Sequence, residues 1–121
     1  MTFSRWILGL SLSLLAFAPP AALWPRCRSC HMIGPGAQTR AGPHLTALAG
    51  RKAGSLPGFR YSSALQRAGA DGLVWTPETL SLYLSTPEVL APGLTKRAGR
   101  IADPAARRDL IAWLLRQGAP D

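Results

Sequence analysis

Two cysteines and a histidine form the stretch of the sequence best suited to chemistry. They lie in the segment Cys27-Arg28-Ser29-Cys30-His31, and the chain has no other cysteine. Two thiols separated by two residues, with a histidine directly after the second, are typical of a c-type haem attachment site. Each thiol can form a thioether with one haem vinyl group, and the neutral imidazole of His31 can bind the iron on its proximal side. The predicted cofactor is therefore one haem c, attached through Cys27 and Cys30.

The same cysteine spacing also occurs in redox-active disulfides and in zinc sites. A zinc site needs two further good ligands, and outside this segment only His44 and carboxylates remain. A redox pair would leave His31 without a role. The five residues therefore favour haem attachment, but on their own they leave a haem-free thiol protein open.

The size and charge of the chain limit the classes of protein to which it can belong. Its 121 residues are enough for one domain, whose core would be modest without a large apolar cofactor. The net charge is +8, which suits nucleic acid, anionic membranes or acidic proteins as partners. The sequence has no nucleic-acid motif and its basic residues are scattered. We therefore expect no nucleic acid, and we favour redox proteins with acidic docking faces as partners.

The N-terminus is typical of a targeting segment. Arg5 precedes the uncharged apolar run Trp6–Ala18, whose length fits the hydrophobic region of a signal peptide. We expect residues 1–22 to be a signal peptide and residues 23–121 to form the folded domain. If the segment is not cleaved, Trp6–Trp24 is just long enough to anchor the domain in a membrane, the only case in which we expect membrane contact. Both alternatives place the domain in the periplasm.

Several short motifs follow the attachment segment. They are Gly50-Arg51-Lys52-Ala53-Gly54, Pro57-Gly58-Phe59-Arg60-Tyr61-Ser62, Trp75-Thr76-Pro77-Glu78-Thr79-Leu80, Tyr83-Leu84, Pro92-Gly93 and Arg108-Asp109-Leu110-Ile111-Ala112-Trp113-Leu114. With these motifs, residues 26–116 resemble the class I cytochromes c of the mitochondrial and c2 type. The resemblance implies an all-α class I cytochrome c fold, with short helices wrapped around one covalently bound haem. It also implies a carrier of single electrons rather than an enzyme.

Capping residues predict three helices that would position these motifs. They are Ser63–Ala68 after Ser62, a helix from Pro77 to about Ser85 after Thr76, and a helix from Pro104 to about Gln117 after Asp103. The last helix has enough apolar residues to be mostly buried.

The resemblance also implies roles for residues outside the attachment segment. The residue that matches Pro43 offers its carbonyl to the proximal histidine, which fixes the tautomer and orientation of the ring. The residues that match Arg51, Tyr61 and Trp75 hydrogen-bond or pair with the haem propionates, which are costly to bury unpaired. Tyr83 is expected to line the haem pocket. Trp75 and Tyr83 could equally be core aromatics, and Arg51 could be a surface charge.

The sequence departs from this family at the sixth ligand of the iron. The family usually places a methionine four residues after the proline of Pro92-Gly93, and here that position holds Lys96. Lys96 could bind iron as a neutral amine, after losing a proton from a group whose pKa is ordinarily about 10.4. It could instead point to solvent and leave the iron open, or another side chain that the sequence does not identify could bind the iron on this side. An open iron predicts weak peroxidase activity or the binding of a gas or other small ligand.

A second departure lies before Cys27, where the family has a helix that crosses the C-terminal helix. Few residues separate the expected cleavage site from Cys27, so we expect that helix to be truncated or replaced by the leader. Leu23 and Trp24 would be what remains of its packing. The C-terminal helix is expected to expose Leu110 or Trp113, or to pack against an uncleaved leader.

Overall fold

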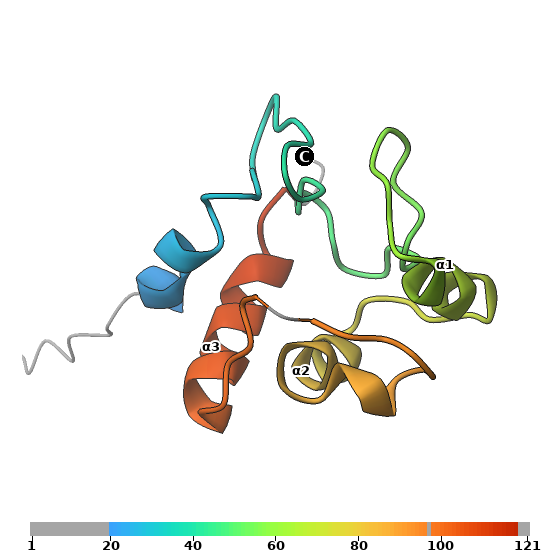
Figure 1. Ribbon diagram of the computed structural model, residues 1–121. Coiled ribbons are helices and arrows are strands. Elements are labelled where there is room, and N and C mark those ends of the chain that lie inside the picture. Colours follow the sequence, from blue (N-terminus) through green and yellow to red (C-terminus); the bar gives the residue numbers. More distant parts are fainter. Residues whose placement is uncertain (1–19, 97, 119–121) are drawn as a thin grey trace, which may run out of the picture.

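Helices and long loops make up the part of the chain that the structure describes, residues 20–96 and 98–118. In this computed structural model the elements are, in order, the 3₁₀ helix η1 (Pro20–Arg26), α1 (Ser63–Ala70), α2 (Pro77–Ser85), the 3₁₀ helix η2 (Pro87–Val89) and α3 (Pro104–Leu115) (Figure 1). No strand forms within these residues, although Lys52 and Val74 make one isolated antiparallel bridge. The prediction of an all-α fold is therefore confirmed for this part of the chain.

Side chains at the N-termini of the three α-helices determine where each begins. The Ser62 hydroxyl accepts a hydrogen bond from a backbone N–H in the first turn of α1 at 3.2 Å. Thr76 and Thr79 cap α2 reciprocally, because each hydroxyl accepts from the other residue's N–H. The Asp103 carboxylate accepts from the first turn of α3 at 3.0 Å. Each cap stabilises its helix by about 1 kcal/mol, and all three helices begin where the sequence predicts.

The second and third helices pack on each other and provide much of the core. Leu80 from α2 and Leu114 from α3 are buried, and Leu94, from the loop between these helices, is only 1% exposed. Residues from α1 and from the loops before α1 and α2 complete the same buried cluster. It comprises Leu48, Ala53, Ala64, Leu65, Trp75, Leu80, Leu94, Ile111 and Leu114. The helices thus share one interior, to which long loops also contribute.

The loop over residues 51–54 fits closely against α1. A Cβ at Gly69 would overlap the carbonyl oxygen of Ala53, so only glycine allows this approach between the helix and the loop. On its other side the loop is tied to the entry of α2, because the N–H of Trp75 donates to the carbonyl of Arg51 at 2.9 Å. These two contacts fix the backbone that carries Arg51.

The 3₁₀ helix η1 lies where the family's N-terminal helix was expected to be truncated. It packs against α3, and the ring centroids of Trp24 and Trp113 lie 5.5 Å apart. Leu110 is only 2% exposed, and Trp113 is partly buried against the core. The expected exposure of Leu110 is therefore wrong. The alternative expectation was that the leader packs against α3. It is met in part, because η1 includes residues 20–22 of the expected leader and packs against α3.

The expected leader otherwise lies outside the described residues, since the description begins at residue 20. The expected boundary after Ala22 falls inside η1. From residue 20 onward, no described helix combines the length and the apolar composition that crossing a membrane requires.

Replacing Trp24 with alanine should weaken the packing of η1 on α3. Truncating a buried tryptophan costs about 3–5 kcal/mol, and because Trp24 is only partly buried we expect the free energy of unfolding to fall by roughly 2 kcal/mol. Denaturant unfolding of the haem-loaded protein, followed by circular dichroism, measures this loss. Val89→Ala is the control, because Val89 is 66% exposed and should cost no more than about 0.5 kcal/mol. Equal losses for the two variants would mean that η1 does not stabilise α3.

Candidate functional site

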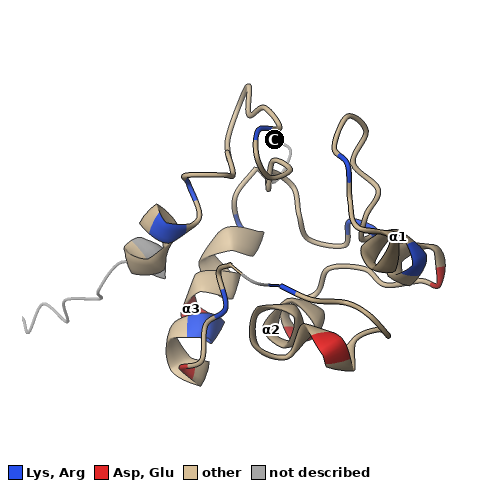
Figure 2. Cartoon of the chain, in the orientation of Figure 1, with Lys and Arg blue, Asp and Glu red and all other residues tan. Residues whose placement is uncertain are grey.

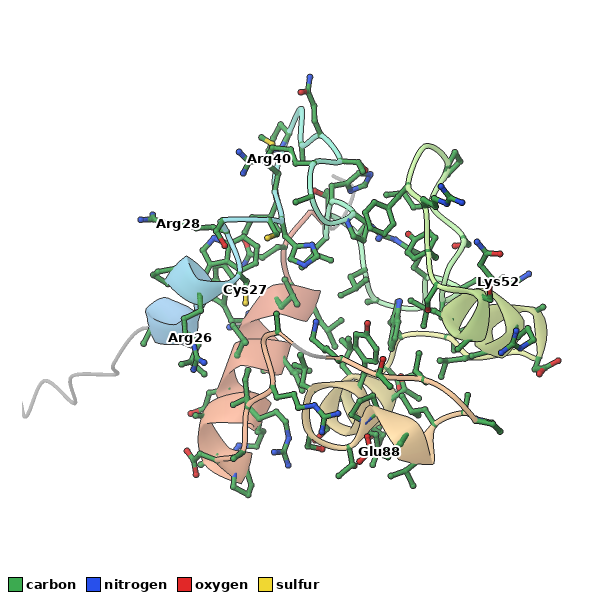
Figure 3. The ribbon with its side chains drawn as sticks, viewed as in Figure 1. Arg26, Cys27, Arg28, Arg40, Lys52 and Glu88 are labelled. Atoms are coloured by element: carbon green, nitrogen blue, oxygen red, sulfur yellow. The ribbon has the colours of Figure 1, made fainter. Side chains whose placement is uncertain are left out.

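All nine residues predicted at the site border one cavity of about 350 Å³. They are Cys27, Cys30, His31, Pro43, Arg51, Tyr61, Trp75, Tyr83 and Lys96. Figure 3 shows Cys27 beside the interior that the helices and loops surround. The other lining residues are mostly apolar and include Leu45, Leu48, Leu65, Leu80, Leu84, Leu110 and Leu114. The cavity is therefore a largely apolar chamber with a small set of polar groups.

A tight turn brings the two cysteines and the histidine to this cavity. The N–H groups of Cys30 and His31 both donate to the carbonyl oxygen of Cys27, at 3.1 and 3.0 Å. Both thiols are free; Cys27 is partly buried and Cys30 is exposed. Burial raises the pKa of the Cys27 thiol, and the nearby Lys96 cation opposes that rise. The turn thus presents two sulfurs and an imidazole to the same chamber.

The imidazole of His31 is held with one nitrogen satisfied and the other free to bind a metal. Its Nδ1–H donates to the carbonyl oxygen of Pro43 at 2.7 Å, which leaves the lone pair on Nε2. Gly42 lies directly against the ring, since a Cβ there would come within 2.6 Å of Nδ1. Burial lowers the pKa of His31, and the hydrogen bond to Pro43 opposes that fall. The burial favours the neutral imidazole, which is the form that binds iron.

The guanidinium of Arg51 borders the cavity without a carboxylate partner among the described residues. It donates to the carbonyl oxygen of His44 at 2.9 Å and to that of Thr46, which leaves further N–H donors available. Burial lowers the pKa of Arg51. Because a buried cation is costly unless it is paired, an anionic group in the cavity would stabilise this arrangement.

Aromatic side chains form part of the cavity wall. The ring centroids of Trp75 and Tyr83 lie 5.0 Å apart, and Trp75 is 7% exposed. The Tyr61 hydroxyl accepts a hydrogen bond from the N–H of Leu56 at 3.3 Å, and the Tyr61 ring meets Phe59 edge to face. Trp75 therefore serves as core and as cavity wall at once, so the two alternatives for this residue are not exclusive.

Lys96 reaches the cavity from the loop between η2 and α3. Its Nζ lies 5.0 Å from the centroid of the Tyr83 ring, so the side chain turns inward. Burial lowers the pKa of Lys96, and the thiols of Cys27 and Cys30 oppose that fall.

Reasoning from the sequence did not assign several residues to the cavity, among them Trp24, Phe59 and Gly42. Trp24 and Phe59 line it, and Gly42 sets the space available to the His31 ring. Phe59 lies within one of the motifs, but no periodic pattern marks it as a wall residue. Gly42 directly precedes Pro43, yet only the folded loop shows that the imidazole occupies the space of its missing side chain.

The chemistry of these groups fits a haem c and does not fit zinc. Two free thiols, a neutral imidazole and an apolar chamber match the attachment and proximal ligation of a haem. In the described part of the chain, no three histidine, cysteine, aspartate or glutamate side chains gather as metal ligands. His44, the remaining histidine, does not line the cavity.

Comparison with known proteins gives c-type cytochromes as relatives. A cytochrome c2 of Agrobacterium tumefaciens (strain II Chrys) is 43% identical over 94 residues, which cover 78% of this chain and 85% of the relative. Cytochrome c-550 of Ancylobacter novellus is 39% identical, covering 80% and 91%. The solved structure of cytochrome c2 from Rhodospirillum centenum gives a TM-score of 0.71 at 36% identity, covering 78% of this chain and 92% of that chain. No family model matches.

The fold and the site together define a class I c-type cytochrome, as the motifs predicted. Within that class, the identities and coverage show that the chain belongs to the cytochrome c2 family. It is an electron carrier with one haem c attached through Cys27 and Cys30. When bound, the haem iron exchanges one electron between its ferric and ferrous states. The haem-free thiol protein is thereby excluded.

Replacing Gly42 with alanine should displace the His31 ring, because the new Cβ would overlap it. Overpacking of this kind costs about 1–3 kcal/mol, and we expect less haem per polypeptide after maturation in a periplasm. Absorbance of the haem and the protein measures the ratio.

Gly36→Ala is the matched control for this loop. Its φ of +72° makes alanine strained there, but a Cβ would meet nothing within 4 Å. Gly36→Ala should therefore introduce backbone strain only, and we expect it to incorporate haem about as well as the unmodified protein. If Gly42→Ala also incorporates haem normally, the contact with the imidazole does not limit the site.

Proposed function

We propose that this cytochrome exchanges electrons in the periplasm through a basic surface beside its haem attachment turn, which docks on acidic faces of redox proteins. We call this surface the basic rim and define it as Arg26, Arg28 and Arg40. All three side chains are exposed, and Figure 3 shows them along the segment that carries Cys27. The clustering of positive charge at this one edge is the observation that carries the proposal.

The distribution of acidic residues supports this assignment. Residues 1–70 contain no aspartate or glutamate, and all six acidic residues of the chain come later. In Figure 2 the acidic residues lie near α1 and on the α2 and α3 side of the molecule, whereas the N-terminal segment carries only basic ones. The Arg40 guanidinium donates to the Arg28 carbonyl at 3.1 Å, which ties two parts of the rim together. An acidic partner would therefore meet the attachment turn first.

Inside the cavity, we assign the haem carboxylates to Arg51, Tyr61 and Trp75. Arg51 supports this because its cation has no carboxylate partner among the described residues. Tyr61 and Trp75 line the same cavity and carry an O–H and an N–H donor, respectively. Tyr83 and the leucines would exclude water from the remainder of the group.

We also propose that residues 1–22 direct export of the chain and are then removed. The apolar run Trp6–Ala18 behind Arg5 supports a signal peptide. Retention of this segment as a membrane anchor is the alternative.

Weak peroxidase activity or gas binding would need an open iron position. Efficient peroxide cleavage would also need a general acid–base group in the cavity. The histidine that lines the cavity is His31, which the attachment turn uses, and Lys96 lies over Tyr83. These contacts favour electron transfer over the open-site alternative.

The basic rim predicts opposite salt effects on electron transfer with small redox reagents of opposite charge. We expect oxidation of the ferrous protein by hexacyanoferrate(III), an anion, to slow as ionic strength rises. Oxidation by tris(phenanthroline)cobalt(III), a cation, should accelerate, because salt screens attraction in the first case and repulsion in the second. Arg28→Glu should slow the reaction with the anion roughly threefold at low salt. Stopped-flow absorbance measures both rates.

The matched control for the rim is Arg67→Glu. Arg67 is exposed on α1 and does not line the cavity, and the substitution changes the net charge by the same amount. It should slow the reaction with the anion much less. If the two variants slow it equally, net charge alone governs the rate and the basic rim is not the docking surface.

Cleavage of the leader predicts a defined mass for the mature protein. We expect the periplasmic fraction of cells that express the full chain and attach haem c to contain polypeptide from about residue 23 plus one haem. Intact-mass spectrometry checks this. A full-length haem protein found in the membrane fraction would instead establish the anchor.

A further inference from the structure

Lys96 occupies an unusual position for a lysine. It lines the same cavity as His31 and is partly buried, with its Nζ 5.0 Å from the Tyr83 ring centroid. The chain folds back beside it, since a Cβ at Gly99 would lie 3.4 Å from the Lys96 Cε. The side chain is therefore held inward by the loop around it.

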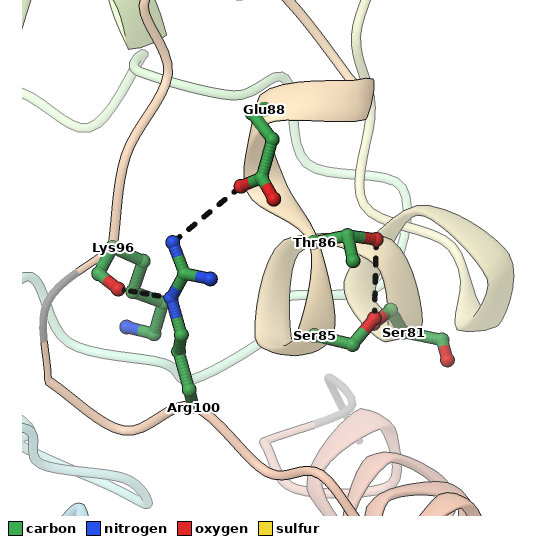
Figure 4. Close-up of polar contacts among 6 residues, drawn as sticks. All are labelled: Ser81, Ser85, Thr86, Glu88, Lys96 and Arg100. Carbon is green, nitrogen blue, oxygen red and sulfur yellow. Dashed lines mark hydrogen bonds and ion pairs between the residues drawn. The ribbon is translucent and has the colours of Figure 1, made fainter.

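The loop that carries Lys96 is anchored from outside the cavity. Arg100 Nε donates to the Lys96 carbonyl oxygen at 2.7 Å, and the same guanidinium pairs with Glu88 at 3.4 Å. Figure 4 shows Arg100 bridging the two residues. These contacts fix the backbone of Lys96 relative to η2 and leave its amine free to face the interior.

No carboxylate neutralises the Lys96 ammonium in the described part of the chain. The two ion pairs found there are Arg100–Glu88 and Arg108–Asp109. The groups that favour its charged form are the thiols of Cys27 and Cys30, and the Tyr83 ring face. Burial of the amine without a carboxylate beside it favours its neutral form, which is the form with a free lone pair.

Few other groups in the cavity could bind iron. Met32 and His44 do not line it. An arginine does not lose its proton, and burial raises the pKa of Tyr83, which disfavours its phenolate. His31 and Lys96 are thus the two nitrogen donors of the cavity that can become neutral, and they come from separate segments of the chain.

We propose that the ε-amine of Lys96 is the second axial ligand of the haem iron, opposite His31. The inference rests on the proposed function, because it requires the haem to be attached. The ammonium releases one proton to solvent, the nitrogen lone pair forms the bond to iron, and a water molecule leaves if one was bound. No electron is transferred in this step. Lysine replaces the methionine that is usual in the family, so the reduction potential should be lower than with methionine and histidine ligands.

The test is the coordination of the ferric haem in protein matured from the full chain in a periplasm. Electron paramagnetic resonance and resonance Raman spectra should show low-spin, six-coordinate iron. Lys96→Ala should lose the low-spin signal and become high-spin. Lys96→Arg should do the same, because it keeps the positive charge but cannot donate a lone pair. Lys96→Met should remain low-spin and gain a sulfur-to-iron charge-transfer band, with a raised potential.

Lys52→Ala is the matched control, because Lys52 is the only other lysine in the chain and is exposed. It should leave the spectrum unchanged. An independent readout uses the unmodified sequence with ¹⁵N at the lysine Nζ, for which electron–nuclear double resonance should detect a ¹⁵N coupling to iron. This measurement does not depend on whether any variant folds.

Three results separate the inference from the proposed function. A high-spin unmodified protein, or a low-spin signal that persists without change in Lys96→Ala, overturns lysine ligation. Absence of a ¹⁵N coupling overturns it as well. In all these cases, a protein that keeps its covalent haem and is reduced reversibly by one electron would leave the proposed function intact. Irreversible redox behaviour or loss of the haem would contradict the proposed function itself.

Discussion

The hydrogen bond from His31 Nδ1 to the Pro43 carbonyl is the contact on which the site depends. It fixes the tautomer and the plane of the ring, and Gly42 provides the space that the ring occupies. Arg51 holds the next part of this loop, because its guanidinium donates to the carbonyl oxygens of His44 and Thr46. Arg51 itself lies in the loop over residues 51–54, which packs closely against α1 at Gly69. A continuous series of contacts therefore links the His31 imidazole to α1. The imidazole is positioned by the fold as well as by the attachment turn.

Much of the helical fold could be predicted because its determinants are local. Ser62, Thr76 and Asp103 each cap a helix through bonds that span three residues, and such patterns are visible in a sequence. The helix η1 has no such signature: it is a 3₁₀ segment with a proline inside, and its packing partner α3 lies far along the chain. Leu110 is likewise buried by long-range packing, because it lies on α3 and lines the cavity together with residues from distant loops.

The sequence predicted which residues come together at the site, because the motifs lie in an order that one family shares. All nine predicted residues border one cavity. The sequence alone could not say what each side chain does there. The inward turn of Lys96 depends on Gly99 and on the Arg100–Glu88 pair, none of which is marked by the motifs. Gly42 is not marked by the motifs either. It matters because it has no Cβ, and the His31 ring occupies that space.

The cavity also bears on how the protein is made. A chain that folded without haem would keep this cavity of about 350 Å³ and leave its mostly apolar walls in contact with water. Apolar surface that stays in water forgoes about 25 cal/mol for each Å² that the haem would cover. The haem-free chain should therefore be less stable than the haem-bound protein. A chain that has not yet received haem should open more readily, which keeps both thiols within reach of the attachment machinery, and chains that miss attachment should be cleaved more easily by proteases.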